Sequence, residues 1–203
     1  MPDNEEHVLV IPASVIDSIG RIDGFQSDVE RFLGPILQSD QLSYQPRGAM
    51  EIDPSFKQLI PYVVLEWTND TGQVMVFAYT RGGGGGEKRL HAKRSIGIGG
   101  HISREDGDDG KDAYSTGMHR EINEEIQLGA QYTETQEGLI YDPSNEVGRV
   151  HLGVVHRFVL DSPQVTSKES DLAEGCFVSI DELRQQHDQL ETWSQLALDA
   201  LYA

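Results

Sequence analysis

The sequence predicts a mixed α/β domain of the α+β type, and three features indicate it. Apolar, β-branched and aromatic runs of strand length recur along the chain. A helix with an apolar stripe interrupts them near residue 120, and a capped helix ends the chain. With 203 residues, 37% hydrophobic and 25% charged, the chain has the size and composition of one globular domain with a small extension.

The first 50 residues predict a strand over 7–16 and a helix over 27–37, followed by a polar connection over 38–50. This segment is too short to bury a core by itself. We therefore expect an N-terminal strand–helix extension, 1–50, that packs on a main domain, 51–203.

The main domain begins with two strand-like runs, 57–67 and 73–80, and the turn signal "TNDTG" between them predicts a hairpin. The apolar stretch 95–102 predicts a further strand, and the following helix carries the octet 119–126 and is expected to stop at Gly129. Later strands are predicted over 137–142, 148–160 and 175–180. The segment 179–203 predicts one helix, with Ser179 and Glu182 in capping-box spacing.

Acidic residues outnumber basic ones by 34 to 16, which gives a formal charge of -18. This balance argues against general binding to nucleic acid, whose phosphates require a basic surface. No apolar run reaches the roughly 20 residues of a membrane span. The acidic N-terminus lacks the pattern of a signal peptide, and one cysteine allows no internal disulfide, so we expect a cytoplasmic protein.

The basic residues are concentrated in one short stretch, 81–94. Such a segment can bind phosphate groups, although charge balance on a surface hairpin is the alternative. The five residues in it are Arg81, Lys88, Arg89, Lys93 and Arg94.

The octet "HREINEEI" places Glu121, Glu124 and Glu125 at spacings i, i+3 and i+4, so their carboxylates share one face of the predicted helix. Met118, Ile122 and Ile126 form the adjoining apolar stripe. Clustered carboxylates suit a hard divalent cation such as Mg²⁺, which prefers oxygen ligands and is often shared with substrate phosphates. A solvated face of an acidic protein is the other interpretation.

The glycine-rich stretch "GIGGHI" lies between the basic segment and the acidic helix, and glycines let a backbone approach a ligand closely. A carboxylate cluster for metal beside cations for phosphate is the combination that metal-assisted cleavage of a phosphoanhydride requires. His101, next to these glycines, is a further candidate for phosphate contact.

These residues resemble the box of the Nudix hydrolases, G-x5-E-x7-R-E-U-x-E-E-x-G-U, where U is a bulky aliphatic residue. Residues 120–126 match its second half, and Gly99, Gly100 and His101 match its start. Asp112 stands where the first glutamate is expected before Arg120, twelve residues after Gly100 rather than six, which implies a six-residue loop insertion within a box over 99–129. Gln127 replaces the later glycine.

The resemblance implies a mixed sheet sandwiched between helices, with Mg²⁺ or Mn²⁺ bound by Glu121, Glu124 and Glu125 and by the backbone carbonyl of Gly99. It also implies that Arg120 pairs with a glutamate and holds its carboxylate in place, and that Glu124 or a carboxylate from elsewhere acts as the base. Candidates for a later carboxylate are Glu169, Asp171 and Glu174.

The implied function is metal-dependent hydrolysis of the diphosphate bond in a nucleoside diphosphate linked to another group. The alternative is a catalytically weak Nudix module that binds a nucleotide-type ligand for regulation. The resemblance also implies a homodimer and a small-molecule ligand, without nucleic-acid or membrane partners.

Overall fold

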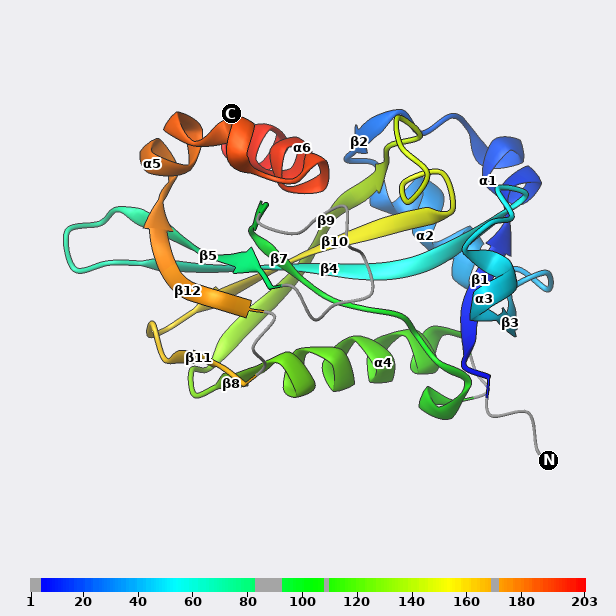
Figure 1. Ribbon diagram of the computed structural model, residues 1–203, viewed down its shortest axis with the longest axis horizontal. Coiled ribbons are helices and arrows are strands. Elements are labelled where there is room, and N and C mark those ends of the chain that lie inside the picture. Colours follow the sequence, from blue (N-terminus) through cyan, green and yellow to red (C-terminus); the bar gives the residue numbers. More distant parts are fainter. Residues whose placement is uncertain (1–4, 83–92, 108–109, 169–171) are drawn as a thin grey trace. The chain divides into compact units, whose positions relative to one another are not determined.

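The structure is a computed structural model that describes residues 5–82, 93–107, 110–168 and 172–203 (Figure 1). The chain divides into two compact units, each built from segments that are far apart in the sequence. Unit 1 contains the described parts of 1–61, 99–120 and 138–154, and unit 2 contains those of 62–98, 121–137 and 155–203. The predicted boundary between an extension and a main domain at residue 50 stays a prediction.

A large mixed sheet with helices confirms the predicted α+β fold class. Its principal strands are β2 (Gly24–Gln26), β4 (Phe56–Thr68), β5 (Val74–Arg81), β9 (Tyr132–Tyr141), β10 (His151–Leu160) and β12 (Leu172–Ser179). Over the described residues the sheet contains ten strands, and its main path of hydrogen-bonded neighbours is β12-β5-β4-β10-β9-β2.

Unit 1 contains the N-terminal elements. They are β1 (His7–Pro12), α1 (Ala13–Ile19), α2 (Val29–Leu37), β3 (Ser43–Pro46), α3 (Arg47–Met50) and the 3₁₀ turn η2 (Arg104–Asp106). β1 pairs antiparallel with β3 and with the start of β4, where Val10 lies opposite Gln58.

The N-terminal strand is shorter than the predicted 7–16, because it ends at Pro12 and the chain continues as α1. Proline has no N–H to donate to a ladder, so it suits the end of a strand. Ile16 is then buried from the helix instead of from the strand. The predicted helix over 27–37 is confirmed as α2, whose N-cap Asp28 accepts a hydrogen bond from the Arg31 N–H at 3.3 Å.

The core of unit 1 combines side chains from early and late in the sequence. Because no single segment could bury this cluster alone, the first 50 residues and the later segments of the unit stabilise each other. Its buried members are Leu9, Ile11, Ile16, Ile22, Phe32, Leu33, Ile36, Leu59, Ile102, Tyr114, Leu139, Leu152 and Val154.

Unit 2 confirms the predicted hairpin, since the end of β4 pairs antiparallel with β5, with Trp67 opposite Met75. The predicted strand 95–102 is reduced to two short strands, β6 (Arg94–Ser95) and β7 (Gly97–Ile98), which pair with β5 and β4. A Cβ atom at Gly97 would come within 2.1 Å of the Tyr62 ring, so only glycine allows this close approach.

The central helix, α4 (Gly110–Glu125), ends four residues earlier than the predicted stop at Gly129. Ile126–Leu128 form β8 instead, paired antiparallel with β11 (Val165–Ser167). The β-branched Ile126 suits a strand, and this pairing with a distant segment overrides the helical pattern of the local sequence.

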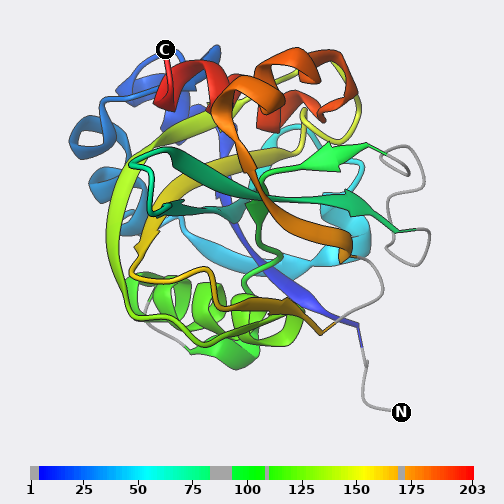
Figure 2. The same cartoon turned by 90° about the vertical axis from the view of Figure 1, so that its left-hand side faces the viewer.

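The predicted C-terminal helix is divided into α5 (Ile180–Gln185), the 3₁₀ turn η3 (His187–Gln189) and α6 (Thr192–Leu201), coloured orange to red in Figures 1 and 2. The predicted cap is confirmed, because the Ser179 side chain accepts a hydrogen bond from the Glu182 N–H at 3.2 Å. The helix is interrupted where Glu191, in extended backbone conformation, donates its N–H to the Arg94 carbonyl at 2.9 Å.

The interruption brings the Glu191 carboxylate, 5% exposed, into a buried polar cluster of unit 2. Ser95 donates to this carboxylate at 2.6 Å, and Arg81 forms an ion pair with it at 2.8 Å. Ser194 accepts the Ile96 N–H at 3.0 Å, and its hydroxyl lies 2.7 Å from that of Tyr62. The spacing of Ser179 and Glu182 predicts the cap of the C-terminal segment, but no local sequence pattern indicates this buried polar cluster.

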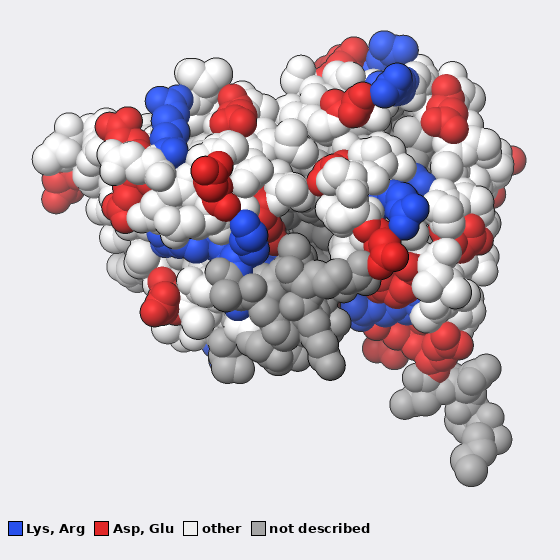
Figure 3. All heavy atoms as spheres, turned by 45° about the horizontal axis from the view of Figure 1, so that its top comes forward, with Lys and Arg blue, Asp and Glu red and all other residues white. Residues whose placement is uncertain are grey.

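The surface carries charges of both signs. On the face shown in Figure 3, Asp and Glu side chains are interspersed with Lys and Arg rather than gathered by sign.

Within the described part of the chain, every helix is too short or too polar to cross a membrane.

The polar cluster gives a first prediction. Ser194→Ala removes the buried acceptor of the Ile96 N–H and a partner of Tyr62, so we expect the free energy of unfolding to fall by about 1–3 kcal/mol. Urea denaturation measures the change. Thr192→Ala, which removes an exposed hydroxyl from the same helix, is the matched control and should stay within about 0.5 kcal/mol of wild type. Equal stability of both variants would contradict the role of Ser194.

Candidate metal and phosphate site

The three glutamates of the octet lie in the last two turns of α4, all in unit 2. Glu124 is exposed, whereas Glu121 and Glu125 are half-buried and one carboxylate oxygen of Glu125 is enclosed. Of the predicted apolar stripe, Met118 and Ile122 are buried from α4, with exposed fractions of 1% and 3%, whereas Ile126, 0% exposed, is buried from β8 rather than from the helix. The buried stripe holds the helix in place, and the carboxylates flank it.

Three carboxylates at the C-terminal end of a helix face the negative end of its dipole, where a cation is favoured and an anion is not. Lys168 compensates part of this charge: its Nζ donates to the Asn123 carbonyl at 2.5 Å, and its backbone N–H donates to the Glu125 carbonyl at 2.8 Å. Carboxylate oxygens at helix spacing are also the ligand type that Mg²⁺ prefers. The residues of this helix end therefore fit a hard divalent cation.

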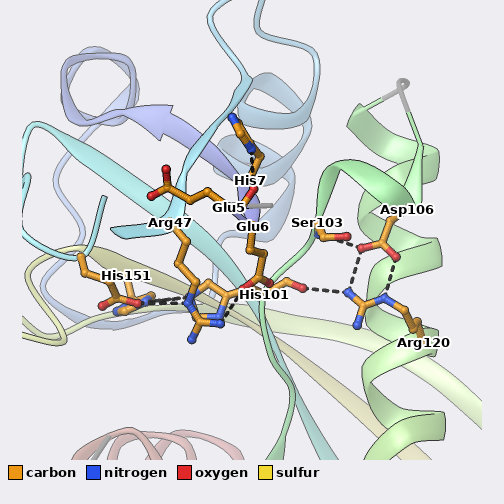
Figure 4. Close-up of polar contacts among 10 residues, drawn as sticks. Glu5, Glu6, His7, Arg47, His101, Ser103, Asp106, Arg120 and His151 are labelled. Carbon is orange, nitrogen blue, oxygen red and sulfur yellow. Dashed lines mark hydrogen bonds and ion pairs between the residues drawn. The ribbon is translucent and has the colours of Figure 1, made fainter. Parts of the chain in front are cut away.

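Arg120, the residue before the glutamates, is held by an aspartate that the sequence interpretation did not assign to the box. Its Nε donates to Asp106 at 2.7 Å and its terminal nitrogen donates to the other oxygen of the same carboxylate at 2.9 Å. A further hydrogen bond joins it to the His101 carbonyl at 3.0 Å. Figure 4 shows this guanidinium between the aspartate and the segment that contains His101. The predicted pairing of Arg120 with a glutamate stays a prediction.

Residues of its own 3₁₀ turn, η2, also hold the Asp106 side chain in place. Its carboxylate accepts the Ser103 N–H at 2.8 Å, and the Ser103 side chain accepts the Glu105 N–H, which together form the capping box of η2. Helix α4 passes close to the carboxylate, since a Cβ atom on Gly117 would lie 2.6 Å from an Asp106 oxygen. The Asp106 side chain is only 3% exposed.

The contact with Arg120 changes how the box is aligned. Asp106 stands six residues after Gly100, which is the spacing of the first acidic residue in the family pattern. Thirteen residues, 107–119, then separate Asp106 from Arg120, six more than the seven of the pattern. The alignment with Asp106 thus moves the extra residues from before the acidic position to after it. The exact spacing from Gly100 was the sequence signal that could have identified Asp106.

The electrostatics of Asp106 follow from these contacts. Burial of the carboxyl raises its pKa, but hydrogen bonds from Arg120 and from the Ser103 backbone outweigh burial, so the pKa lies below its usual value. The carboxylate form is therefore favoured by folding.

The predicted phosphate-binding cations within the described residues have partners in the C-terminal segment of unit 2. Arg81 pairs with Glu191, whose carboxylate is the main cause of a raised Arg81 pKa. Lys93 Nζ donates to the Asp188 carbonyl at 3.0 Å, and Arg94 donates to the Gln186 side chain. Lys88 and Arg89 lie outside the described residues. Phosphate contact by this group stays a prediction.

His101, the remaining predicted phosphate contact, lies in unit 1 with its side chain 14% exposed. Its Nε2 is 3.3 Å from Nε2 of His151, and the two rings meet edge to face with centroids 5.4 Å apart. Burial, together with the nearby charge of Arg47, lowers the His101 pKa well below its usual range. The lowered pKa favours the neutral imidazole, and phosphate contact by His101 stays a prediction.

Of the three candidates for a later carboxylate, Glu169 and Asp171 lie outside the described residues. Glu174 is exposed in β12, at a register shift between Ala173 and Cys176, and has a positive φ of 57°. Thr80 donates to the Glu174 carboxylate at 3.4 Å.

Gly99, the predicted carbonyl ligand, directly follows β7 and belongs to unit 1. Its role stays a prediction.

Comparison with known proteins adds independent information. No protein-family model matches the sequence. Protein YmaB of Bacillus subtilis is 39% identical over 161 residues, a match that covers 76% of this chain and 76% of YmaB. The proposed Nudix hydrolase Tm1382 is 29% identical in sequence, and its crystal structure aligns with 96% of this chain and 97% of its own at a TM-score of 0.77.

A more distant solved structure is the Nudix domain of Shewanella oneidensis NrtR, crystallised with ADP-ribose. It covers 71% of this chain and 86% of its own at a TM-score of 0.56 and 12% identity. At that identity, the likeness concerns the fold alone.

The ion pair at Asp106 gives a second prediction. Asp106→Asn should lower the free energy of unfolding at pH 7 by about 1–3 kcal/mol, because it replaces a charge-assisted acceptor of Arg120 with a neutral one. The folded pKa is lowered, so the carboxylate contributes stability above the unfolded pKa of about 3.9 and loses it as pH falls through the folded pKa.

The difference between wild type and Asp106→Asn should therefore shrink below about pH 3.9. Urea denaturation at pH 7 and pH 3 measures both effects. Glu105→Gln, which changes an exposed carboxylate of the same turn, is the control. A deficit that is the same at both pH values would contradict the ion-pair explanation.

Proposed function

The chain belongs to the Nudix hydrolase family, and from this premise we propose that it is an Mg²⁺-dependent hydrolase of phosphoanhydride bonds. The substrate class is a nucleoside diphosphate linked to another group. The observation that carries the proposal is the set of three carboxylates in the last two turns of α4, at the negative end of the helix dipole.

The proposed ligands of the divalent cation are Glu121, Glu124 and Glu125. When bound, Mg²⁺ or Mn²⁺ supplies electrostatic stabilisation of the charge that develops on the phosphate oxygens. The chain's own contribution is to hold acidic side chains together on a helix whose apolar stripe is buried.

Hydrolysis breaks the bond between one phosphorus and the bridging oxygen and forms a bond from the water oxygen to that phosphorus. We assign Glu124, the most exposed of the three glutamates, as the side chain that accepts the water proton. The products are two phosphomonoesters, and the bridging oxygen leaves with the second phosphate.

Arg120 has a positioning role in this proposal. Its guanidinium is held by both oxygens of Asp106 and by the His101 carbonyl, so it joins the loop after Gly100 to α4. It immediately precedes Glu121, and holding Arg120 in place restricts the turn of the helix from which the glutamates project.

The glutamates give a third prediction. The purified full-length protein, incubated with Mg²⁺ and a panel of nucleoside diphosphate derivatives, should release phosphomonoesters, detected as phosphate after addition of a phosphatase. Glu124→Gln should lower the rate by about 10²–10⁴-fold, the usual contribution of a general base. Its unfolding free energy should stay within about 0.5 kcal/mol of wild type, because the side chain is exposed.

Glu30→Gln changes an exposed glutamate on α2 and should leave the rate unchanged. Removal of divalent cations by a chelator should stop the reaction, and added Mg²⁺ should restore it. Equal rates for wild type and Glu124→Gln would contradict the assigned base. Saturable nucleotide binding without turnover across the panel would contradict the hydrolase and favour a binding module.

A further inference from the structure

Two histidines and a glutamate from three distant segments converge in unit 1. Glu51 follows α3, His101 follows the glycines after β7, and His151 is the first residue of β10. The Nε2 atoms of the two histidines are 3.3 Å apart, and Nε2 of His101 is 3.8 Å from Oε1 of Glu51. The three potential ligand atoms all lie within 4.8 Å of one another. Figure 4 shows His101 and His151 side by side, with Arg47 next to them.

The separation of the two imidazole nitrogens matches a shared metal ion. Two nitrogens bound to Zn²⁺ at about 2.0–2.1 Å with a tetrahedral angle lie roughly 3.3–3.4 Å apart. The nitrogens of His101 and His151 already have this spacing. A metal at that position needs only a small movement of the Glu51 carboxylate, which is on a half-exposed side chain, to complete three ligands.

His151 has the orientation that metal-binding histidines typically have. Its Nδ1 lies 2.8 Å from the Val147 carbonyl, so this nitrogen carries the proton and donates it. The Nε2 atom consequently presents its lone pair towards His101. A hydrogen bond to a backbone carbonyl fixes both the tautomer and the ring plane of a histidine ligand.

A buried carboxamide beside His151 is a second, independent observation. Gln58 is 1% exposed, and neither its side-chain nitrogen nor its side-chain oxygen has a hydrogen-bond partner among the described residues. The Gln58 N–H donates to the Val150 carbonyl at 2.8 Å, which places the two strands next to each other here.

The alternation of side chains along each strand shows on which face of the sheet Gln58 and His151 lie. Leu59 and Leu152, the residues after Gln58 and His151, both pack in the main core cluster of unit 1. Because successive side chains point to opposite faces, Gln58 and His151 share the other face. Buried amides without partners are rare, and a water bound to a metal ion next to His151 would donate a hydrogen bond to the Gln58 side-chain oxygen.

We propose that Glu51, His101 and His151 bind a divalent transition-metal ion of the Zn²⁺ class, at a site chemically different from the Mg²⁺ site proposed on α4. Imidazole nitrogens select Zn²⁺ and similar ions, whereas Mg²⁺ selects oxygen ligands. Two histidines and one carboxylate leave a fourth position for water or an oxygen ligand. The inference does not depend on the proposed hydrolysis.

The competing explanation is a hydrogen bond between the two histidines, with Glu51 held only by Arg47. Arg47 pairs with Glu51 at 3.4 Å, but its shorter contact is with Glu6, at 2.8 Å. Arg47 therefore keeps a carboxylate partner when Glu51 turns towards the histidines.

The test is a Zn²⁺ titration of the full-length protein by calorimetry in excess Mg²⁺, which occupies oxygen-ligand sites. Wild type should bind one Zn²⁺ per chain, and Zn²⁺ should raise its thermal unfolding midpoint. His101→Gln and Glu51→Gln should each weaken Zn²⁺ binding at least tenfold and abolish the rise in midpoint. Tetrahedral Co²⁺ absorption, present in wild type and lost in His101→Gln, gives an independent readout of the ligands.

Matched controls are His7→Gln, which removes an imidazole from the start of β1, and Glu30→Gln on α2. Both should bind Zn²⁺ as wild type does. Glu51 is half-exposed, so Glu51→Gln keeps the test decisive if His101→Gln fails to fold. No Zn²⁺ binding by wild type, unchanged binding in the folded ligand variants, or loss of binding in Glu124→Gln instead would each overturn the proposal.

Discussion

The bidentate ion pair between Asp106 and Arg120 is the interaction that holds the glycine-rich segment, the 3₁₀ turn and the unit 1 part of α4 together. The aspartate closes a 3₁₀ turn through Ser103, and the arginine belongs to the helix that carries the three glutamates. The same guanidinium binds the His101 carbonyl, so one planar cation connects the glycine-rich segment, the 3₁₀ turn and α4. Arginine suits this task because its fork of donors matches a carboxylate and leaves further N–H groups for a carbonyl. Lysine, a single point charge, could not make this set of contacts with the same geometry.

Local sequence patterns were sufficient to predict an element where its packing follows the helical or strand spacing of its apolar residues. Three predictions of this kind are confirmed: burial of Met118 and Ile122 on α4, the hairpin of β4 and β5, and the Ser179 cap. Predictions were wrong where a distant partner decides the local structure. Ile126–Leu128 becomes a strand because Val165–Ser167 pairs with it, and the C-terminal helix is interrupted because the Glu191 carboxylate enters a polar cluster beside Ser95.

The site shows the same division. The spacing of Glu121, Glu124 and Glu125 places them on one helix without knowledge of the rest of the chain, and α4 contains all three, while their role as metal ligands stays a prediction. Asp106 was missed because counting back from Arg120 leads to Asp112, and the contact of Asp106 with the guanidinium is seen only in the folded chain. The group of Glu51, His101 and His151 could not be found from the sequence, since its members are separated by about fifty residues each and meet only in the folded chain.

The composite origin of the unit 1 core has a consequence for synthesis of the protein. Leu9 and Val154 are members of one buried cluster, although 145 positions (154 − 9) separate them along the chain. Contacts of such long range make folding slow, because the entropy of closing a large loop is lost before the contacts form. On the ribosome, β3 and the start of β4, which pair with β1, follow within the first 58 residues, but the cluster that includes Leu9 is complete only after the segment around Val154 has been translated. The nascent chain therefore carries an incompletely covered apolar cluster through most of its elongation, the period in which chaperones would be of most use to it.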